Sequence, residues 1–348
     1  MYKERLKDFK NIGIIQTAFI GDTALSLYLC QTIRNYHPEC KLTFISTPVS
    51  APLTASAKAI DSVITYDKRG LQSGLRGLRF IAESIKEKEI ECLIVPHRSY
   101  RSAVLSFLSK PDYSVSFNKS SFSILYNRRV KYQKFSHERE RNHDLLKAFS
   151  DFGDIAAAGE VELDISDEDK SFIESKLHWL NADEKANVLI APGSVWETKK
   201  WKEHHFISLI NLLMSKNCNV LLTGSEKDKE ICSRIAASSG AVNLAGETSL
   251  PQTIYLMQNC SLTITNDSAP THLAGIAKCP CITLYGPTSP IFGFGPLGEG
   301  SIALEVNGLK CKPCAIHGSN KCPKKTHECM ESLSPDMVFE HVVKILNL

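Results

Sequence analysis

The sequence predicts an α/β protein made of two doubly wound, parallel-sheet domains. Three observations support this fold class. The chain has 348 residues, β-rich runs alternate with helix-spaced runs, and the alternation starts again after a polar segment near the middle. This length suits two domains of roughly 100 to 200 residues each. Alternating β and α units favour a parallel sheet with helices on both faces.

The first half contains four short β-rich runs and two helix-spaced runs. The β-rich runs are residues 11–19, 41–47, 62–67 and 91–97, and the helical ones are 22–36 and about 75–88. Short apolar or β-branched runs bounded by turn residues are typical of buried strands. We therefore expect a first Rossmann-like domain over residues 1–165.

The second half repeats this rhythm more fully. Strands are expected at 187–193, 219–224, 241–246, 261–266 and 280–286, and helices at 203–216, 226–239, 250–259 and 269–277. They predict a second Rossmann-like domain over residues 187–333, followed by a C-terminal helix over 334–348. Ligands of such sheets bind at the carboxyl ends of the strands.

Residues 166–186 join the two domains as a linker and a helix. Ser166 precedes Asp167-Glu168-Asp169, which resembles an acidic triplet that holds a divalent metal in some sugar-nucleotide enzymes. A serine followed by acids is also a favourable helix start, because the hydroxyl caps the helix and the carboxylates complement its dipole. We favour the helix start and expect no catalytic metal.

Composition indicates a soluble globular protein with an uneven charge. Residues 1–160 hold 24 Lys and Arg against 17 Asp and Glu, a charge of +7, whereas residues 161–348 hold 17 against 21, a charge of −4. We expect the first half to bind something acidic, but not nucleic acid. Neither a signal peptide nor an apolar run of about 18 residues is present, so a cytoplasmic location without a transmembrane segment is predicted.

The junction "ITNDSAPTHLAG" (264–275) joins a predicted strand to a predicted helix. Asp267 or Ser268 is expected to cap the helix, and Pro270 suits its first turn. Free N–H groups and the dipole at such a helix start form an anion site. His272 lies one turn after Ser268 and is placed to face the same ligand; the alternative is a capped helix with a histidine in the core.

The stretch "APGSVWETKKW" (191–201) places a small loop and two lysines after a strand. Ser194 and Lys199 are candidate phosphate ligands, while a solvated basic loop is the alternative. The P-loop spacing is absent, as is Gly-x-Gly-x-x-Gly after the first strand, which disfavours a nicotinamide dehydrogenase.

Two acidic residues also follow predicted strands. Asp22, after Gly21, begins a helix and is a candidate general base; capping that helix is compatible with this role, because a carboxylate has several lone pairs. Glu247 is a candidate ligand of a ribose or, alternatively, a helix cap.

Five ordered segments together resemble glycosyltransferase family nine: "GDTALSLYL", "APGSVWETKKWKEHHF", "LAGETSL", "NDSAPTHLAGIAKCPCITLYGPTSP" and "CKPCAIHGSNKCPKKTHECM". Within that family the chain is similar to the ADP-heptose:lipopolysaccharide heptosyltransferases, especially the heptosyltransferase II branch. The resemblance implies a GT-B fold, with two Rossmann-like domains facing a central cleft. It also implies an inverting transfer that needs no metal.

The resemblance also implies roles for individual residues. Asp22 matches the catalytic base and Lys199 the phosphate-contacting lysine. The remaining donor-site matches are Ser194, Glu247, Asp267 and His272, with backbone N–H groups around Ser268 and Ala269. The family usually has glycine where this chain has Ala269, and a positive φ at that position would be costly for alanine.

Four of the twelve cysteines are clustered, namely Cys311, Cys314, Cys322 and Cys329 in the loop 311–329. Their spacing, with two histidines nearby, suggests a structural zinc site in a reducing compartment. Cysteines that only pack, or that form a labile disulfide, are the alternative. The other eight cysteines lie singly in apolar segments and suit core positions.

The resemblance implies ADP-heptose as donor and the Kdo-lipid A inner core, or its heptosylated form, as acceptor. The acceptor is expected on the basic first half, where Arg98, Arg101 and Arg128 are candidate ligands of its carboxylates and phosphates. Peripheral association with the cytoplasmic face of the inner membrane follows from a lipid acceptor. Alternatives are a GT-B transferase with another donor or glycan, a catalytically silent nucleotide-sugar-binding protein, and a sugar-nucleotide epimerase.

Overall fold

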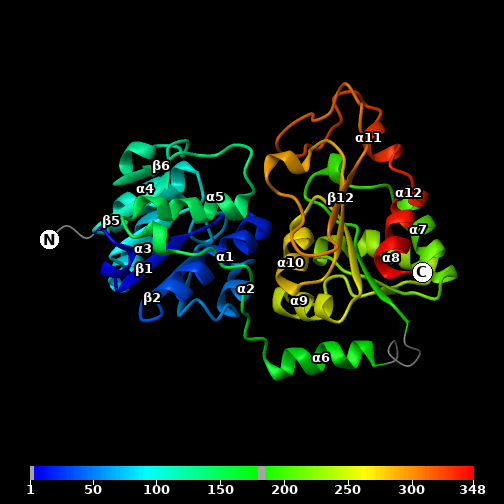
Figure 1. Cartoon of the computed structure of the whole chain (residues 1–348), viewed down its shortest axis with the longest axis horizontal. Helices are drawn as coiled ribbons and strands as arrows, with labels where there is room; N and C mark the ends of the chain where they lie inside the picture. Colours follow the sequence, from blue (N-terminus) through cyan, green and yellow to red (C-terminus); the bar gives the residue numbers. More distant parts are fainter. Residues whose placement is uncertain (1–3, 179–184) are drawn as a thin grey trace. The chain divides into compact units, whose positions relative to one another are not determined.

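The structure is a computed structural model that describes residues 4–178 and 185–348. The chain divides into two compact units, Met1–Asp164 (unit 1) and Ile165–Leu348 (unit 2). Each unit has a single parallel sheet of six strands (Figure 1). Within the described residues, no helix has the length and apolar character needed to cross a membrane.

The sheet of unit 1 has the strand order β3-β2-β1-β4-β5-β6, and every pairing in it is parallel. The strands are β1 (Asn11–Ile15), β2 (Lys41–Ser46), β3 (Ser62–Thr65), β4 (Cys92–Val95), β5 (Tyr113–Phe117) and β6 (Arg128–Val130). The helices are α1 (Ile20–Tyr36), α2 (Ala51–Ala55), α3 (Gly74–Glu87), α4 (Tyr100–Ser109) and α5 (Glu138–Asp144).

The sheet of unit 2 has the order β12-β11-β10-β7-β8-β9 and is also parallel. Its strands are β7 (Asn187–Ala191), β8 (Asn219–Leu222), β9 (Val242–Asn243), β10 (Leu262–Asn266), β11 (Cys281–Tyr285) and β12 (Ile302–Glu305). Its helices are α6 (Asp167–Leu177), α7 (Glu203–Ser215), α8 (Lys229–Ser239), α9 (Leu250–Gln258), α10 (Ala269–Ala277), α11 (Glu328–Glu331) and α12 (Pro335–Leu346).

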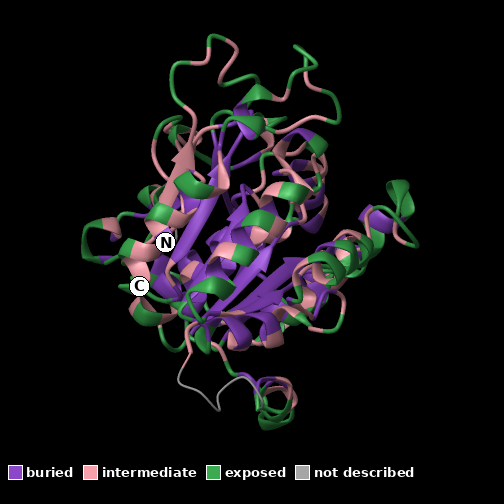
Figure 2. Ribbon diagram, turned by 90° about the vertical axis from the view of Figure 1, so that its right-hand side faces the viewer, coloured by how far each residue is buried: buried purple, intermediate pink, exposed green. Residues whose placement is uncertain are grey.

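The central strands are buried on both faces, as is typical of parallel sheets covered by helices. All five residues of β7, β10 and β11 are buried, and β1 has four buried residues after its first. Figure 2 shows buried strands enclosed by helices whose outer faces are exposed. The predicted α/β class with two doubly wound sheets is therefore confirmed.

The strand order reverses at one place in each sheet, between β1 and β4 in unit 1 and between β7 and β10 in unit 2. The segments that follow these two neighbouring strands leave the carboxyl edge of the sheet in opposite directions. Such a switch point is where doubly wound sheets bind ligands. Asp22 follows β1, Lys199 follows β7 and Asp267 follows β10, so all three predicted residues lie in switch-point segments.

Candidate active site

The switch point of unit 2 holds a lysine and an aspartate that form a largely buried ion pair. The Lys199 Nζ atom lies 2.6 Å from Asp267 Oδ2, and their side chains are 12% and 10% exposed. Thr288 donates its hydroxyl to the same Oδ2 atom at 2.6 Å. Two contacts on one oxygen fix the aspartate, which in turn holds the lysine ammonium at the carboxyl ends of β7 and β10.

Asn266 joins the segments that follow these two strands. Its Nδ2 atom donates to the Pro192 carbonyl at 2.8 Å, and its Oδ1 atom accepts the Trp201 N–H at 3.0 Å. Trp201 is 1% exposed, and its indole N–H donates to the Leu333 carbonyl at 2.7 Å. The loop that carries Lys199 is therefore held at both ends by buried hydrogen bonds.

The start of α10 differs from the prediction in one respect. Ser268 is the N-cap residue, but its side chain makes no capping hydrogen bond. Its hydroxyl lies instead 3.2 Å from the Thr265 hydroxyl. The N-cap therefore falls on one of the two residues predicted for it, but it is formed without a side-chain hydrogen bond, because the Ser268 hydroxyl contacts the neighbouring threonine.

Ala269 is the first residue of α10 and is not among the non-glycine residues with positive φ. Alanine thus occupies this position without the strain that a left-handed conformation would cause. His272 lies in the same helix, is 4% exposed, and has its ring centroid 6.2 Å from that of Phe294.

The other two predicted donor-site residues lie at the same edge of the sheet. Ser194 follows β7, and its hydroxyl accepts the Trp196 N–H at 3.3 Å. Glu247 follows β9 and is exposed; its Oε2 atom lies 2.7 Å from the Lys176 Nζ atom of α6. A ligand of Glu247 would have to share it with this lysine or displace it.

Asp22 is the third residue of α1 and is partly exposed. Its Oδ2 atom accepts the Phe19 N–H at 3.3 Å, so the predicted capping role is present. Burial lowers the pKa of Lys68, which donates to the Thr17 carbonyl, and the charges of Arg69 and Arg101 lower it further. The nearby Asp22 carboxylate opposes this shift only in part. The Asp22 carboxylate and the Lys68 ammonium therefore share the switch point of unit 1.

His97 follows β4 at this switch point and was not predicted as a site residue. Its Nδ1 atom lies 3.1 Å from the Thr17 hydroxyl, 3.0 Å from that of Ser102 and 3.4 Å from that of Ser99. Burial, Lys68 and Arg98 lower its pKa to about 3, so the ring is neutral near pH 7. The signal in the sequence was its place two residues after the apolar run of β4.

The low pKa of His97 predicts a loss of stability in acid. An unfolded histidine has a pKa of about 6.5, so below that pH the unfolded chain binds a proton that the folded ring binds only near pH 3. Between pH 6.5 and 4.5 the wild type should lose about 2 kcal/mol more unfolding free energy than His97→Gln. Urea unfolding at both pH values measures this difference. Equal losses in the two proteins would contradict it.

The three predicted acceptor arginines lie on unit 1 and contact aromatic rings. The Arg98 guanidinium carbon is 4.1 Å from the centroid of the Tyr132 ring. Arg101 lies 5.4 Å from the Tyr100 ring, and Arg128 lies 6.0 Å from the Tyr113 ring. Arg98 and Arg101 follow β4, at the switch point, whereas Arg128 begins β6 at the far edge of the sheet. The sequence did not reveal this separation.

The four clustered cysteines line one small pocket together with His317 and His327. Burial raises the pKa of Cys322, but backbone N–H groups of residues 324–327 outweigh it and lower the pKa overall. That environment favours a thiolate, the form that binds metals. Among the described residues, no three of these four sulfur atoms lie within 4.8 Å of one another. A different set of three potential metal ligands meets that distance.

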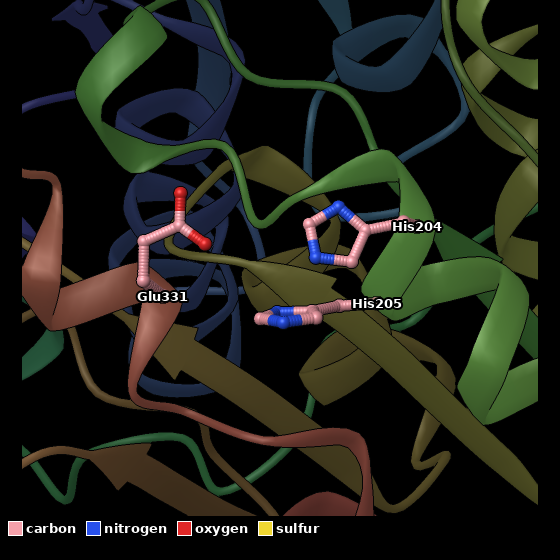
Figure 3. Close-up of side chains that lie close together, drawn as sticks. All are labelled: His204, His205 and Glu331. Carbon is pink, nitrogen blue, oxygen red and sulfur yellow. The ribbon is translucent and has the colours of Figure 1, made fainter.

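That set is His204, His205 and Glu331, drawn in Figure 3, from the first turn of α7 and from α11. Glu331 already forms an ion pair with Lys202, at 3.0 Å. Hydrogen bonding to Lys202, with the charges of Lys202 and both histidines, lowers the Glu331 pKa although burial opposes it. The Lys202–Glu331 ion pair accounts for the position of the carboxylate, and burial keeps the His205 pKa below its ordinary value.

The Cys-rich loop is fastened to the residues around Lys199. Thr198 donates both its N–H and its hydroxyl to the Ser319 carbonyl, at 3.0 and 2.8 Å, and accepts the Ser319 N–H at 2.9 Å. A Cβ atom on Gly318 would lie 2.5 Å from Trp196 Cβ and 2.9 Å from Lys199 Cγ. Position 318 therefore requires glycine for this close packing.

Comparisons with known proteins agree with these features. The family model described as glycosyltransferase family 9 (heptosyltransferase) matches residues 78–324. The chain is 26% identical over 358 residues to lipopolysaccharide heptosyltransferase 2 of Salmonella typhimurium, covering 97% of this chain and 98% of the relative.

Two solved structures share the fold over nearly the whole chain. A glycosyltransferase family 9 protein from Veillonella parvula has a TM-score of 0.86 at 19% identity, with 97% of each chain covered. The ADP-heptose lipopolysaccharide heptosyltransferase II of E. coli has a TM-score of 0.77 at 23% identity, with 97% of this chain and 98% of that chain covered. Because the family model spans more than half of the sequence, this chain belongs to glycosyltransferase family 9 and is a glycosyltransferase with the GT-B fold.

Proposed function

We propose that this protein transfers heptose from ADP-heptose to the inner core of lipopolysaccharide, with unit 2 binding the donor and unit 1 the acceptor. The observation that carries the proposal is the buried Lys199–Asp267 pair at the switch point of unit 2, beside the start of α10. An ammonium next to a helix start attracts the diphosphate of a nucleotide sugar. The likeness to heptosyltransferases supports heptose as the sugar.

On the donor side, Lys199 and the N–H groups around Ser268 and Ala269 contact the diphosphate in this proposal. Because Ser268 does not cap α10 with its side chain, its hydroxyl is not committed to the first-turn N–H groups. Ser194 and His272 lie near the phosphates and the sugar, and Glu247 lies toward the nucleoside.

On the acceptor side, Asp22 removes a proton from the attacking hydroxyl. The hydroxyl oxygen forms a bond to the anomeric carbon on the face opposite ADP, the bond to the diphosphate oxygen breaks, and configuration inverts. Lys199 and the helix start stabilise the charge that develops on the leaving diphosphate, without a metal ion. Arg98 and Arg101, at the switch point, bind anionic groups of a Kdo-lipid A acceptor at the cytoplasmic face of the inner membrane. Arg128, at the far edge of the same sheet, binds a more distant anionic group of this acceptor.

The test is mass spectrometry of truncated lipopolysaccharide incubated with ADP-heptose and the purified protein. The expected result is a mass increase of one heptose on the acceptor, with release of ADP. UDP-sugars should give less product than ADP-heptose. Donor consumption without an acceptor would favour an epimerase, and donor binding without transfer to any acceptor would favour a silent binding protein.

We also propose that the four clustered cysteines bind a structural metal after a small closure of the loop. Their shared pocket and the N–H groups around Cys322 fit a thiolate site. Four thiolates in a tetrahedron suit zinc or iron. The metal would stabilise the loop that contacts Thr198, next to Lys199, and would take no part in the chemistry.

Elemental analysis of the purified protein should therefore give about one equivalent of zinc or iron. Cys322→Ser should lose most of this metal, whereas Cys218→Ser, in the core of unit 2, should retain it. Because the loop is bonded to Thr198, metal loss should also weaken ADP binding. A metal content below about a tenth of an equivalent in the wild type would remove this proposal.

A further inference from the structure

A second carboxylate, that of Glu138, is buried in unit 1 next to the helix that carries Asp22. Glu138 is the first residue of α5, is 6% exposed, and takes no part in the chemistry proposed above. Helix α5 packs against α1, which carries Asp22 in its first turn (Figure 1). A glutamate is almost never buried this deeply unless it is paired, so its position needs an explanation.

The partner of Glu138 is Arg141, one turn further along α5. The Arg141 Nε atom donates to Glu138 Oε2 at 2.6 Å, and the Nη1 atom donates to the Lys134 carbonyl at 3.1 Å. Arg141 is 1% exposed. A buried ion pair is often no more stabilising than apolar side chains of the same volume, because both charges lose their hydration. Stability alone therefore does not account for this pair.

Hydrogen bonds join α5 to the turn of α1 that carries Asp22. The Nδ2 atom of Asn142 donates to the Ser26 hydroxyl at 3.4 Å, and that hydroxyl donates to the Asp22 carbonyl at 2.8 Å. Asn142 and Ser26 are both fully buried. Since Asn142 directly follows Arg141, the buried ion pair is held at a fixed place relative to the Asp22 backbone.

A tyrosine ring connects the ion pair to a proposed acceptor ligand. The centroid of the Tyr132 ring lies 5.0 Å from the guanidinium carbon of Arg141 and 4.1 Å from that of Arg98. Phe117 packs edge-on against the same ring, with the centroids 5.3 Å apart. Two guanidinium groups thus share one ring, and one of them is paired with Glu138 while the other lies at the switch point.

The charges that act on Glu138 come from several elements. Burial raises the pKa of Glu138 to about 7, although Arg141 of α5 opposes it. Asp22 of α1 adds to the rise, and Arg98, after β4, reduces it. The phenol of Tyr132 is a further titratable group within electrostatic reach. Because the interaction of two charges is mutual, an ionised Glu138 favours the protonated form of Asp22 and so strengthens Asp22 as a base.

We propose that Glu138 is a positioning residue for the transfer, whose carboxylate balances the buried Arg141 charge and thereby keeps Asp22 a strong enough base for the acceptor hydroxyl. The hydroxyl proton goes to Asp22, while Glu138 forms no bond to a substrate. The two charges of the pair lie side by side and largely cancel at Asp22, so loss of the Glu138 charge leaves the cation to weaken the base. The inference rests on the proposed function in one respect, the role of Asp22 as the base.

The test is turnover between pH 6 and 8 with saturating donor and a water-soluble acceptor. At pH 8 the wild type should be about 3- to 10-fold faster than Glu138→Gln, because the variant has a weaker base. This ratio should approach one near pH 6, where the wild-type Glu138 is mostly protonated and therefore neutral, like glutamine. ADP affinity should be the same in both proteins, because the donor binds to unit 2 in the proposed function.

A double variant distinguishes the charge of Glu138 from its shape. Glu138→Gln/Arg141→Met removes both charges and should recover most of the lost turnover at pH 8. If Glu138→Gln does not fold, the double variant decides, because the wild type should match it at pH 8 and fall about 3- to 10-fold below it near pH 6. The matched control is Glu140→Gln, which replaces an exposed carboxylate of the same helix and should follow the wild type at every pH.

Two results would overturn the proposal. One is a ratio of wild-type to Glu138→Gln turnover that stays constant from pH 6 to 8. The other is a double variant that is no faster than Glu138→Gln at pH 8, since a purely structural role predicts that the second substitution adds damage.

A measurement without turnover separates this inference from the proposed function. Carbon-13 NMR of protein labelled at the glutamate carboxyl carbons should show a signal that titrates near pH 7 and is absent from the double variant. In Asp22→Asn the same signal should titrate at lower pH, because the like charge is gone. If this shift is seen but no acceptor receives heptose, the coupling stands and the proposed reaction does not. If heptose is transferred but the signal titrates at the same pH in both proteins, the reaction stands and the role of Glu138 does not.

Discussion

Replacing Asp22 by alanine is expected to lower turnover by at least about 100-fold while ADP still binds. General-base catalysis contributes roughly 10² to 10⁴ in rate, and its loss acts on the chemical step rather than on donor affinity. Initial rates with saturating donor and acceptor measure the first effect, and calorimetric titration with ADP measures the second.

A second substitution separates catalysis from helix capping. The Asp22 carboxylate accepts the Phe19 N–H, so alanine also removes a hydrogen bond at the start of α1. Losing a helix cap costs about 1 kcal/mol of stability. Asp22→Asn keeps an oxygen for that N–H but cannot serve as a base. It should unfold at the wild-type temperature with the same rate loss, and near wild-type turnover in Asp22→Asn would refute the assignment.

Replacing Lys199 by methionine is expected to weaken ADP binding and to lower turnover by about 10² to 10³. The magnitude is that of one preorganised donor to a developing negative charge. Methionine retains much of the apolar stem of the lysine and loses the ammonium, which lies 2.6 Å from Asp267. Titration with ADP and steady-state kinetics measure the two losses.

Two controls make this result specific. Lys200→Met removes the neighbouring ammonium, which pairs with Glu197 at 2.7 Å, and should leave both ADP affinity and turnover nearly unchanged. Lys199→Met leaves the buried Asp267 carboxylate without its cation, which costs stability. Lys199→Met/Asp267→Asn should restore the melting temperature but not the activity. If the kinetics of Lys199→Met match those of the wild type, Lys199 does not belong to the active site.

The strands that the sequence revealed are those with continuous apolar runs. "NVLIA" in β7 and "CITLY" in β11 fit the pattern of buried parallel strands. The strand β5 did not stand out, because its sequence "YSVSF" alternates with serine. The structure buries Ser114 and Ser116 and satisfies them with Asn127 and the Val95 carbonyl. Only the partners, distant in sequence, make these serines suitable for a core strand.

The edge strand β12 and helix α4 were also missed. All four residues of β12 are only partly buried, so an edge strand lacks the apolar run of a central one. In α4, "YRSAVLSFLS" mixes serines with apolar residues. Ser102 and Ser106 are buried, which no polar–apolar periodicity reveals.

For the site, the sequence predicted which residues lie at the carboxyl ends of the strands. It did not predict which of these side chains contact one another. Lys199 and Asp267 were both expected at the ends of strands, yet their ion pair depends on the pairing of β7 with β10. Thr288, which fixes Asp267, comes from the segment after β11. His97 looked like the end of a strand. The hydroxyls around its Nδ1 atom come from Thr17, in the segment after β1, and from Ser102, in α4, and the sequence does not show that these segments meet.

The contacts named for Lys199, Asp267, Asn266 and Trp201 all lie within unit 2. The diphosphate pocket proposed here is therefore assembled by the C-terminal half alone. Under the proposed assignment of the acceptor to unit 1, a lineage can alter the N-terminal sheet to accept a new saccharide without changing the residues proposed to bind the activated sugar. The acceptor range, set by unit 1, and the donor choice, set by unit 2, can thus diverge at independent rates.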